Sequence, residues 1–190
     1  MFFPVLKKSF GQRCAPMRLV RKKGLVFFME IEKKFLVKNL PASLESFEKK
    51  EREQGYLCTS PVVRVRKSNE QYILTYKSHI QDKEKMTKSV CMNQEVEVPL
   101  TEEGYYHLRE KADGNLIQKT RYMIPLDSSH KAELDIFHGY LNGLVFVEVE
   151  FESIEDAEKF AAPDWFGEDV SDDRRYANSS LTTCEEKFWE

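Results

Sequence analysis

The chain has 190 residues, of which 41% are hydrophobic and 32% are charged, and its formal net charge is −3. This length suits one domain with a sizeable core, and the apolar content excludes a mostly disordered chain. No apolar run approaches the roughly 20 residues that a membrane span needs. The four cysteines are scattered and form no CxxC pair, so neither a disulfide framework nor a zinc site is expected. We therefore expect a soluble, cytoplasmic protein.

The first 28 residues differ from the rest in charge. They carry seven lysines and arginines and no acid. Such a start could be a targeting segment, but no signal-peptide pattern follows it. We expect residues 1–28 to be a basic N-terminal extension, disordered or not native, and residues 29–190 to form one domain.

Alternation of charged or polar with apolar residues indicates eight strands, at 29–37, 54–60, 62–67, 71–78, 94–99, 116–125, 131–137 and 144–151. Residues 79–93 are polar and without a period, which is typical of a loop. Cap residues Ser43, Thr101 and Ser153 precede amphipathic or acidic segments. Four helices are therefore expected, at 44–53, 101–112, 153–161 and 173–181.

The charged residues of these strands come largely as like-charged neighbours two positions apart, on one face of each strand. They are Glu30, Glu32 and Lys34; Arg64 and Arg66; Lys77; Glu95 and Glu97; Lys119 and Arg121; Glu133 and Asp135; and Glu148 and Glu150. Like charges on one face repel unless opposite charges lie between them. An antiparallel sheet closed on itself would gather them inside, with the helices covering its apolar outside. We therefore predict an α+β, mainly β, fold: an eight-stranded closed barrel with a charged tunnel.

The charges of this tunnel indicate its ligand. Eight carboxylates and six bases sum to −2, so one or two divalent cations would allow a polyanion to bind. Salt bridges without a ligand are the alternative, but burying so many charges only to pair them would cost more than an apolar filling. The chain has no P-loop and no GxGxxG motif. Basic residues interleaved with acids also argue against nucleic acid as a partner.

The ordered set of motifs resembles a known family. The set comprises Glu30-x-Glu32-x-Lys34, Arg64-x-Arg66, Lys77, Glu95-x-Glu97, Lys119-Thr120-Arg121-Tyr122, Glu133-Leu134-Asp135-x-Phe137, Glu148-x-Glu150, Trp165-Phe166-Gly167-Glu168-Asp169-Val170 and Arg175-Tyr176-x-Asn178-x-x-Leu181. It is similar to the CYTH superfamily, the triphosphate tunnel metalloenzymes, and in particular to the short bacterial-type members. The resemblance covers about residues 29–182.

This resemblance implies a triphosphate-binding barrel that uses Mg²⁺ or Mn²⁺. The implied metal ligands are Glu30, Glu32, Glu148 and Glu150, with Asp135 as a weaker candidate. The implied phosphate-binding residues are Lys34, Arg64, Arg66, Lys77, Lys119 and Arg121. Glu30, Glu32, Lys34, Glu148 and Glu150 would be catalytic, and Glu95, Glu97 and Glu133 would be further tunnel acids. The chain departs from the family at Cys91 and Asn93, where an arginine and an acid are usual, so one phosphate or metal contact is in question.

The expected activity is metal-dependent hydrolysis of a linear triphosphate, most simply inorganic tripolyphosphate, to pyrophosphate and phosphate. A nucleoside or thiamine triphosphatase and a class IV-type adenylate cyclase are alternatives within the fold. A non-catalytic module that binds polyphosphate or nucleotide is the alternative from another class. The expected partner is a small triphosphate, with neither nucleic acid nor membrane, for a monomer or homodimer.

Overall fold

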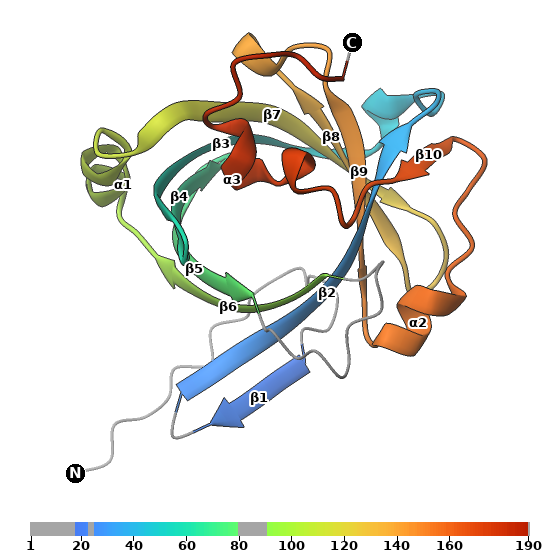
Figure 1. Cartoon of the computed structure of the whole chain (residues 1–190), viewed down its shortest axis with the longest axis horizontal. Helices are drawn as coiled ribbons and strands as arrows, with labels where there is room; N and C mark the ends of the chain where they lie inside the picture. The colour runs from blue at the N-terminus through green and yellow to red at the C-terminus, as the bar shows by residue number, and fades with distance from the viewer. Residues whose placement is uncertain (1–17, 23–24, 80–90, 190) are drawn as a thin grey trace.

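One antiparallel sheet of ten strands dominates the computed structural model, which describes residues 18–22, 25–79 and 91–189 (Figure 1). Side chains are described for residues 30–78 and 95–189. The strands are β1 (Arg18–Lys22), β2 (Leu25–Val37), β3 (Glu48–Thr59), β4 (Val62–Ser68), β5 (Gln71–His79), β6 (Cys91–Pro99), β7 (Asp113–Pro125), β8 (Lys131–Phe137), β9 (Val145–Phe151) and β10 (Phe166–Asp169). Eight of them overlap the eight predicted strands, whereas β1, β10 and the first half of β3 were not predicted as strands.

Strand β2 has four neighbours. On one edge, β6 pairs with Phe28–Glu32 and β10 pairs at Phe35 and Val37. On the other edge, β1 pairs with Leu25–Met29 and β9 pairs with Ile31–Leu36. The 13-residue length of β2 makes this division possible, since each half of the strand can hold a different partner.

The prediction of an eight-stranded closed barrel is wrong. The sheet has ten strands in the order β1-β2-β6-β5-β4-β3-β7-β8-β9, and β10 lies off this path. In a regular closed barrel each strand has one neighbour on each edge, whereas β2 divides both of its edges between two strands. The sheet is strongly curled in Figure 1, and the face on the inside of this curl is called the concave face below.

The apolar residues of the strands form two clusters around the curled sheet. The first packs the outer side of β2, β8 and β9 against β10 and α2, with Leu134, Val147 and Val149 fully buried. The second lies where the C-terminal segment, Val170–Leu181, covers one end of the sheet; Ile117, Phe146 and Leu181 are fully buried there. These clusters fix which face of each strand is turned inward.

Two of the expected helices are confirmed. Helix α1 (Glu102–Arg109) begins after Thr101, whose hydroxyl accepts a hydrogen bond from the backbone N–H of Gly104 at 3.1 Å. Helix α2 (Ile154–Lys159) begins after Ser153, which accepts from the N–H of Asp156 at 3.1 Å. Both caps satisfy an N–H group that a helix end would otherwise leave unpaired.

The other two helix predictions are corrected. The helix expected at 44–53 is a 3₁₀ turn, η1 (Leu44–Ser46), followed by β3, because residues Glu48–Gln54 pair with β7 and this long-range pairing overrides local helix propensity. The segment 173–181 forms η3 (Arg174–Tyr176) and the short α3 (Asn178–Leu181) instead of one helix. A further 3₁₀ turn, η2 (Gly139–Leu141), joins β8 to β9.

Part of the basic N-terminal stretch belongs to the sheet, namely β1 and residues 25–28 of β2. Residues 1–17 and 23–24 lie outside the described part, and the division into an extension and a domain stays a prediction. No helix in the described part of the chain is long and apolar enough to span a membrane.

Candidate functional site

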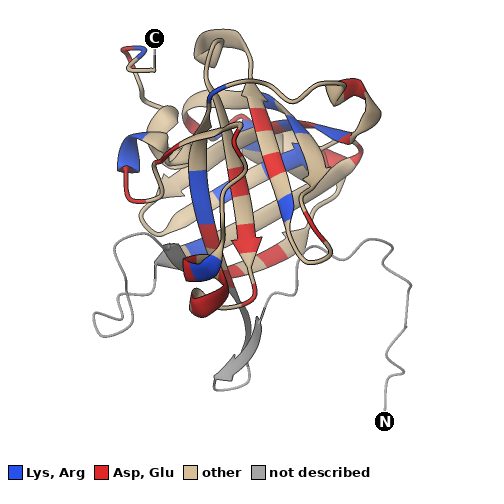
Figure 2. Ribbon diagram, turned by 90° about the vertical axis from the view of Figure 1, so that its right-hand side faces the viewer, with Lys and Arg blue, Asp and Glu red and all other residues tan. Residues whose placement is uncertain are grey.

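The concave face gathers the charged residues that the sequence placed on one face of each strand. Figure 2 shows acidic and basic positions recurring along the strands of the curled sheet, separated by other residues. The register explains the pairing: Glu95 lies opposite Lys77, Asp135 opposite Arg121, and Glu148 opposite Lys34. At these positions opposite charges meet between strands, whereas Glu32 lies opposite Glu150 and Glu133 opposite Glu148.

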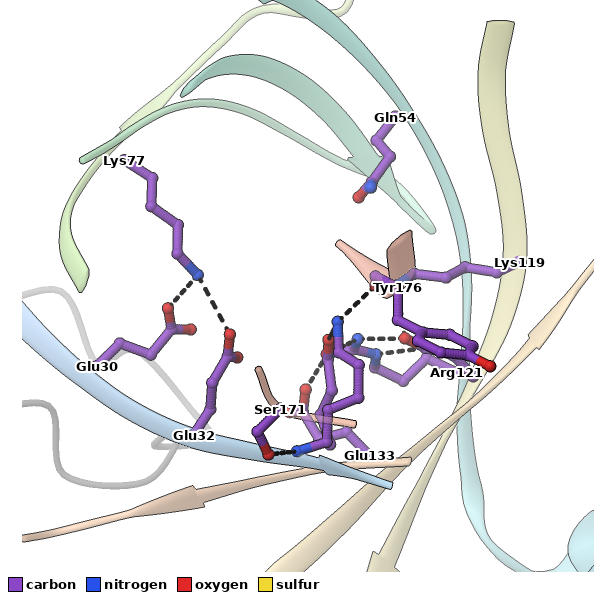
Figure 3. A network of polar contacts seen from close by, with 12 residues as sticks. Glu30, Glu32, Gln54, Lys77, Lys119, Arg121, Glu133, Ser171 and Tyr176 are labelled. Atoms are coloured by element: carbon purple, nitrogen blue, oxygen red, sulfur yellow. Dashed lines mark hydrogen bonds and ion pairs between the residues drawn. The ribbon is translucent and has the colours of Figure 1, made fainter. Parts of the chain in front are cut away.

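One group of contacts centres on Lys77. Its ammonium forms an ion pair with Glu30, and its Nζ lies 3.8 Å from a carboxylate oxygen of Glu32 (Figure 3). The same Nζ lies 3.9 Å from a carboxylate oxygen of Glu95. Glu95 also accepts a hydrogen bond from Nη2 of Arg64 at 3.2 Å. Three acids from β2 and β6 therefore share the charge of two bases.

A second group centres on Arg121. Its guanidinium forms ion pairs with Glu133, Asp135 and Glu148, and the Nη2 to Glu148 Oε2 distance is 2.5 Å. Asp135 also accepts from Nζ of Lys119 at 2.5 Å. This side of the concave face is almost completely buried, so these charges are held at fixed positions by one another.

The C-terminal segment holds Lys34 in place. The backbone N–H of Lys34 donates to Ser171 Oγ at 2.9 Å, and its carbonyl accepts from the N–H of Val170 at 2.8 Å. The Lys34 ammonium donates to the carbonyl of Tyr176 at 2.9 Å and forms an ion pair with Glu148 at 3.0 Å. This role of residues 170–176 was not identified from the sequence, because it consists largely of backbone groups.

Burial and crowding shift the protonation of the acids. Burial, together with the neighbouring carboxylates of Glu30 and Glu32, raises the pKa of Glu150 to about 8. Burial also raises the pKa of Glu32, and it raises that of Glu95 to about 7. For Glu148, Lys34 and Arg121 outweigh burial and hold the pKa well below its usual range. The concave face therefore contains acids with raised pKa values beside an acid with a lowered pKa, as functional sites often do.

Sequence reasoning missed three residues of β3 that share this face. Arg52 and Gln54 are inward-facing, and Gln54 donates to the hydroxyl of Tyr56 at 3.0 Å. Arg52 was missed because residues 44–53 were predicted to be a helix. Gln54 and Tyr56 lie in the strand predicted at 54–60 but were missed because they carry no charge. The period of two that links Arg52, Gln54 and Tyr56 is the signal that would have found them.

The predicted metal ligands lie on the same face of the sheet, but basic side chains lie between them. Among the described residues, no group of three or more His, Cys, Asp or Glu side chains is arranged to hold a metal ion. Lys77 and Arg121 lie between the carboxylates instead. The metal-binding roles therefore stay predictions. Cys91 and Asn93 lie in β6, but their side chains are outside the described part.

Comparisons with known proteins identify relatives. No family model matches the chain. An inorganic triphosphatase of Nitrosomonas europaea is 36% identical over 156 residues, which are 80% of this chain and 95% of that protein. An inorganic triphosphatase of Acetivibrio thermocellus is 34% identical, over 80% of this chain and 92% of that protein. A crystal structure of an inorganic triphosphatase superposes with a TM-score of 0.61 at 32% identity, over 83% of this chain and 97% of that one.

Proposed function

The chain belongs to the inorganic triphosphatases of the CYTH superfamily, and from this membership we propose that it hydrolyses inorganic tripolyphosphate to pyrophosphate and phosphate. The observation that carries the proposal is the buried concave face, where six predicted phosphate-binding bases converge from four strands, β2, β4, β5 and β7. A small polyanion is the ligand that such a set of bases suits best.

The bases divide between two ways of holding phosphate. Arg64, Arg66 and Arg121 would donate pairs of hydrogen bonds to phosphate oxygens, since a planar guanidinium matches two oxygens at once. Lys34, Lys77 and Lys119 would act as point charges. In the structure these bases are paired with carboxylates, for example Arg66 with Glu97 at 2.6 Å, so the substrate would compete with the acids for them.

The acids fit a hard divalent cation by their chemistry. Burial and the neighbouring carboxylates of Glu30 and Glu32 raise the pKa of Glu150 to about 8, and a divalent cation would relieve the repulsion among these acids. We assign Glu30, Glu32, Glu148 and Glu150 as its ligands, with Asp135 as a weaker one, and we favour Mg²⁺ or Mn²⁺. When bound, the cation would polarise the phosphate oxygens and increase the acidity of a bound water.

In the proposed reaction a water molecule attacks a terminal phosphorus of tripolyphosphate. A new P–O bond forms, the P–O bond to the bridging oxygen breaks, and its electron pair leaves with pyrophosphate. The proton of the water passes to a carboxylate of the acidic group, which acts as the general base. The arginines stabilise the charge that develops on the leaving group.

Phosphate release tests this function. We expect the full chain with Mg²⁺ or Mn²⁺ to release phosphate from tripolyphosphate faster than from ATP or thiamine triphosphate. In Glu148→Gln we expect the rate to fall on the order of a hundredfold, because Glu148 is a proposed ligand and also positions Lys34 and Arg121. Circular dichroism would verify that the variant is folded.

The matched control is Glu168→Gln, since Glu168 is an exposed acid of β10; its rate should equal that of the parent. Faster turnover of ATP with formation of cyclic AMP would replace the proposal with a cyclase. Tight binding of tripolyphosphate without turnover would replace it with a binding module.

A further inference from the structure

Arg52 lies next to several positive charges on the concave face. In the sheet it pairs with Lys119 of β7 on one side and with Ser68 of β4 on the other. Two residues further along each strand, Lys50 of β3 lies directly opposite Arg121 of β7. Two successive like-charged pairs thus face each other between β3 and β7, an arrangement that is unfavourable unless carboxylates or another anion compensate the charges. Lys50, Lys119 and Arg121 each form an ion pair with a carboxylate.

Arg52 also lacks the partner that the other inward-facing bases have. Each of the six predicted phosphate-binding bases forms an ion pair with at least one carboxylate, whereas within the described part of the chain no carboxylate pairs with Arg52. The Nε atoms of Arg52, Arg64 and Arg66 are all buried without a hydrogen-bond partner, but Arg64 and Arg66 still pair through Nη2 with Glu95 and Glu97. Burial and the neighbouring Arg121 and Arg66 also lower the pKa of Arg52 well below its usual value.

Such an arginine destabilises the ligand-free protein. A buried donor without an acceptor costs free energy, and repulsion from neighbouring cations adds to that cost. Asp135 is the carboxylate that attracts Arg52, but Lys119 and Arg121 already occupy its oxygens. A bound anion therefore explains the presence of an arginine at position 52, whereas the packing of the fold does not.

We propose that Arg52 is a further substrate-binding residue, which donates hydrogen bonds to a phosphate group of the bound triphosphate together with Arg66. This inference rests on the proposed function and extends its phosphate-binding set to a strand, β3, that the motifs of the family resemblance did not include. Arg52 is four residues along β3 from Tyr56, which is packed beneath the C-terminal segment. Arg66 is near a more open part of the face, since the side chain of its partner Glu97 is 35% exposed.

The proposal predicts opposite effects on stability and on binding. In Arg52→Gln we expect the affinity for tripolyphosphate and 1/KM to fall about tenfold or more, because a charge-assisted hydrogen bond is lost. We expect kcat to change less than KM. The melting temperature without ligand should equal or exceed that of the parent, since the variant removes a repelled charge. Arg52→Lys should restore part of the affinity, because it keeps the charge and loses the paired donors.

Arg174→Gln is the matched control, because Arg174 is an exposed arginine outside the concave face; its KM and melting temperature should not change. A lower ligand-free melting temperature with unchanged KM in Arg52→Gln would show a structural role and overturn the proposal.

Isothermal titration with tripolyphosphate separates this inference from the proposed function. If the parent binds tripolyphosphate without releasing phosphate, the hydrolase fails, while weaker binding by Arg52→Gln still supports the role of Arg52. If Arg52→Gln binds tripolyphosphate as tightly as the parent, the role of Arg52 is refuted even where hydrolysis is observed.

Discussion

His130 connects the turn between β7 and β8 to helix α2. Its Nδ1 lies 2.8 Å from a carboxylate oxygen of Asp127, and its Nε2 lies 3.2 Å from both oxygens of Asp156. The ring also packs against Phe151 and Phe160, with centroids 5.4 and 5.5 Å away. Burial opposes protonation, but the two carboxylates outweigh it and raise the pKa of His130.

Stability should therefore depend on pH through His130. Because its folded-state pKa is raised, its contribution is fully present below the unfolded pKa of about 6.5 and is lost as the pH rises through the folded pKa. We expect His130→Gln to lower the melting temperature more at about pH 6 than at about pH 8. His107→Gln, at an exposed position of α1, should show no such difference. An equal loss at both pH values would mean that His130 acts by packing alone.

At the scale of single residues, the sequence predicted which charged side chains share a face of the sheet but not which of them are in contact. The inward direction of Glu30, Lys77 and Arg121 follows from a period of two, which is a local property of each strand. The partners do not follow from it: Arg64 meets Glu95 across 31 positions, and only the strand order brings them together. The carbonyl of Tyr176 that holds Lys34 carries no sequence signal at all.

At the scale of elements, β3 shows how tertiary pairing overrides local preference. Its first half is rich in Glu and Lys and was predicted to be a helix, yet it pairs with β7 from Glu48 to Gln54. The pairing buries Gln54 and Tyr56 and places Arg52 on the concave face. Helix propensity is worth less than about 1 kcal/mol per residue, so burial of this kind can reverse it.

Gly55 lets β3 pass close to the start of β7. A Cβ atom at this position would lie 2.7 Å from Cβ of Ala112 and 2.8 Å from Cδ2 of Leu116. We expect Gly55→Ala to reduce the free energy of unfolding by about 1–3 kcal/mol, because the backbone of β3 or residue 112 must shift. Urea denaturation would measure this loss. The double variant Gly55→Ala/Ala112→Gly should lose less free energy of unfolding than the sum of the losses in the two single variants, since Leu116 can rotate away. Strict additivity of the two losses would contradict the proposed clash.

At the scale of the whole molecule, β2 connects parts of the sheet that are far apart in the chain. It pairs with β1, β6, β9 and β10, and it carries Glu30, Glu32 and Lys34. The family and its charged interior could be inferred from the order of the motifs. The sequence could not show that each edge of β2 is divided between two strands. The alternation of residues along a strand is the same whatever number of strands pair with it. The fold should therefore lose all of these pairings together when β2 detaches.

Hydrogen exchange tests this coupling. We expect the amides of Ile31–Leu36 to exchange among the slowest in the protein. Those of β1, which among the described strands pairs with β2 alone, should exchange faster. Val147→Ala in β9 removes a fully buried side chain and should cost about 2 kcal/mol. If β2 couples its neighbours, the slow amides of β6 and β10 should lose as much protection as those of β9. Loss confined to β8 and β9 would show that the two edges of β2 open independently.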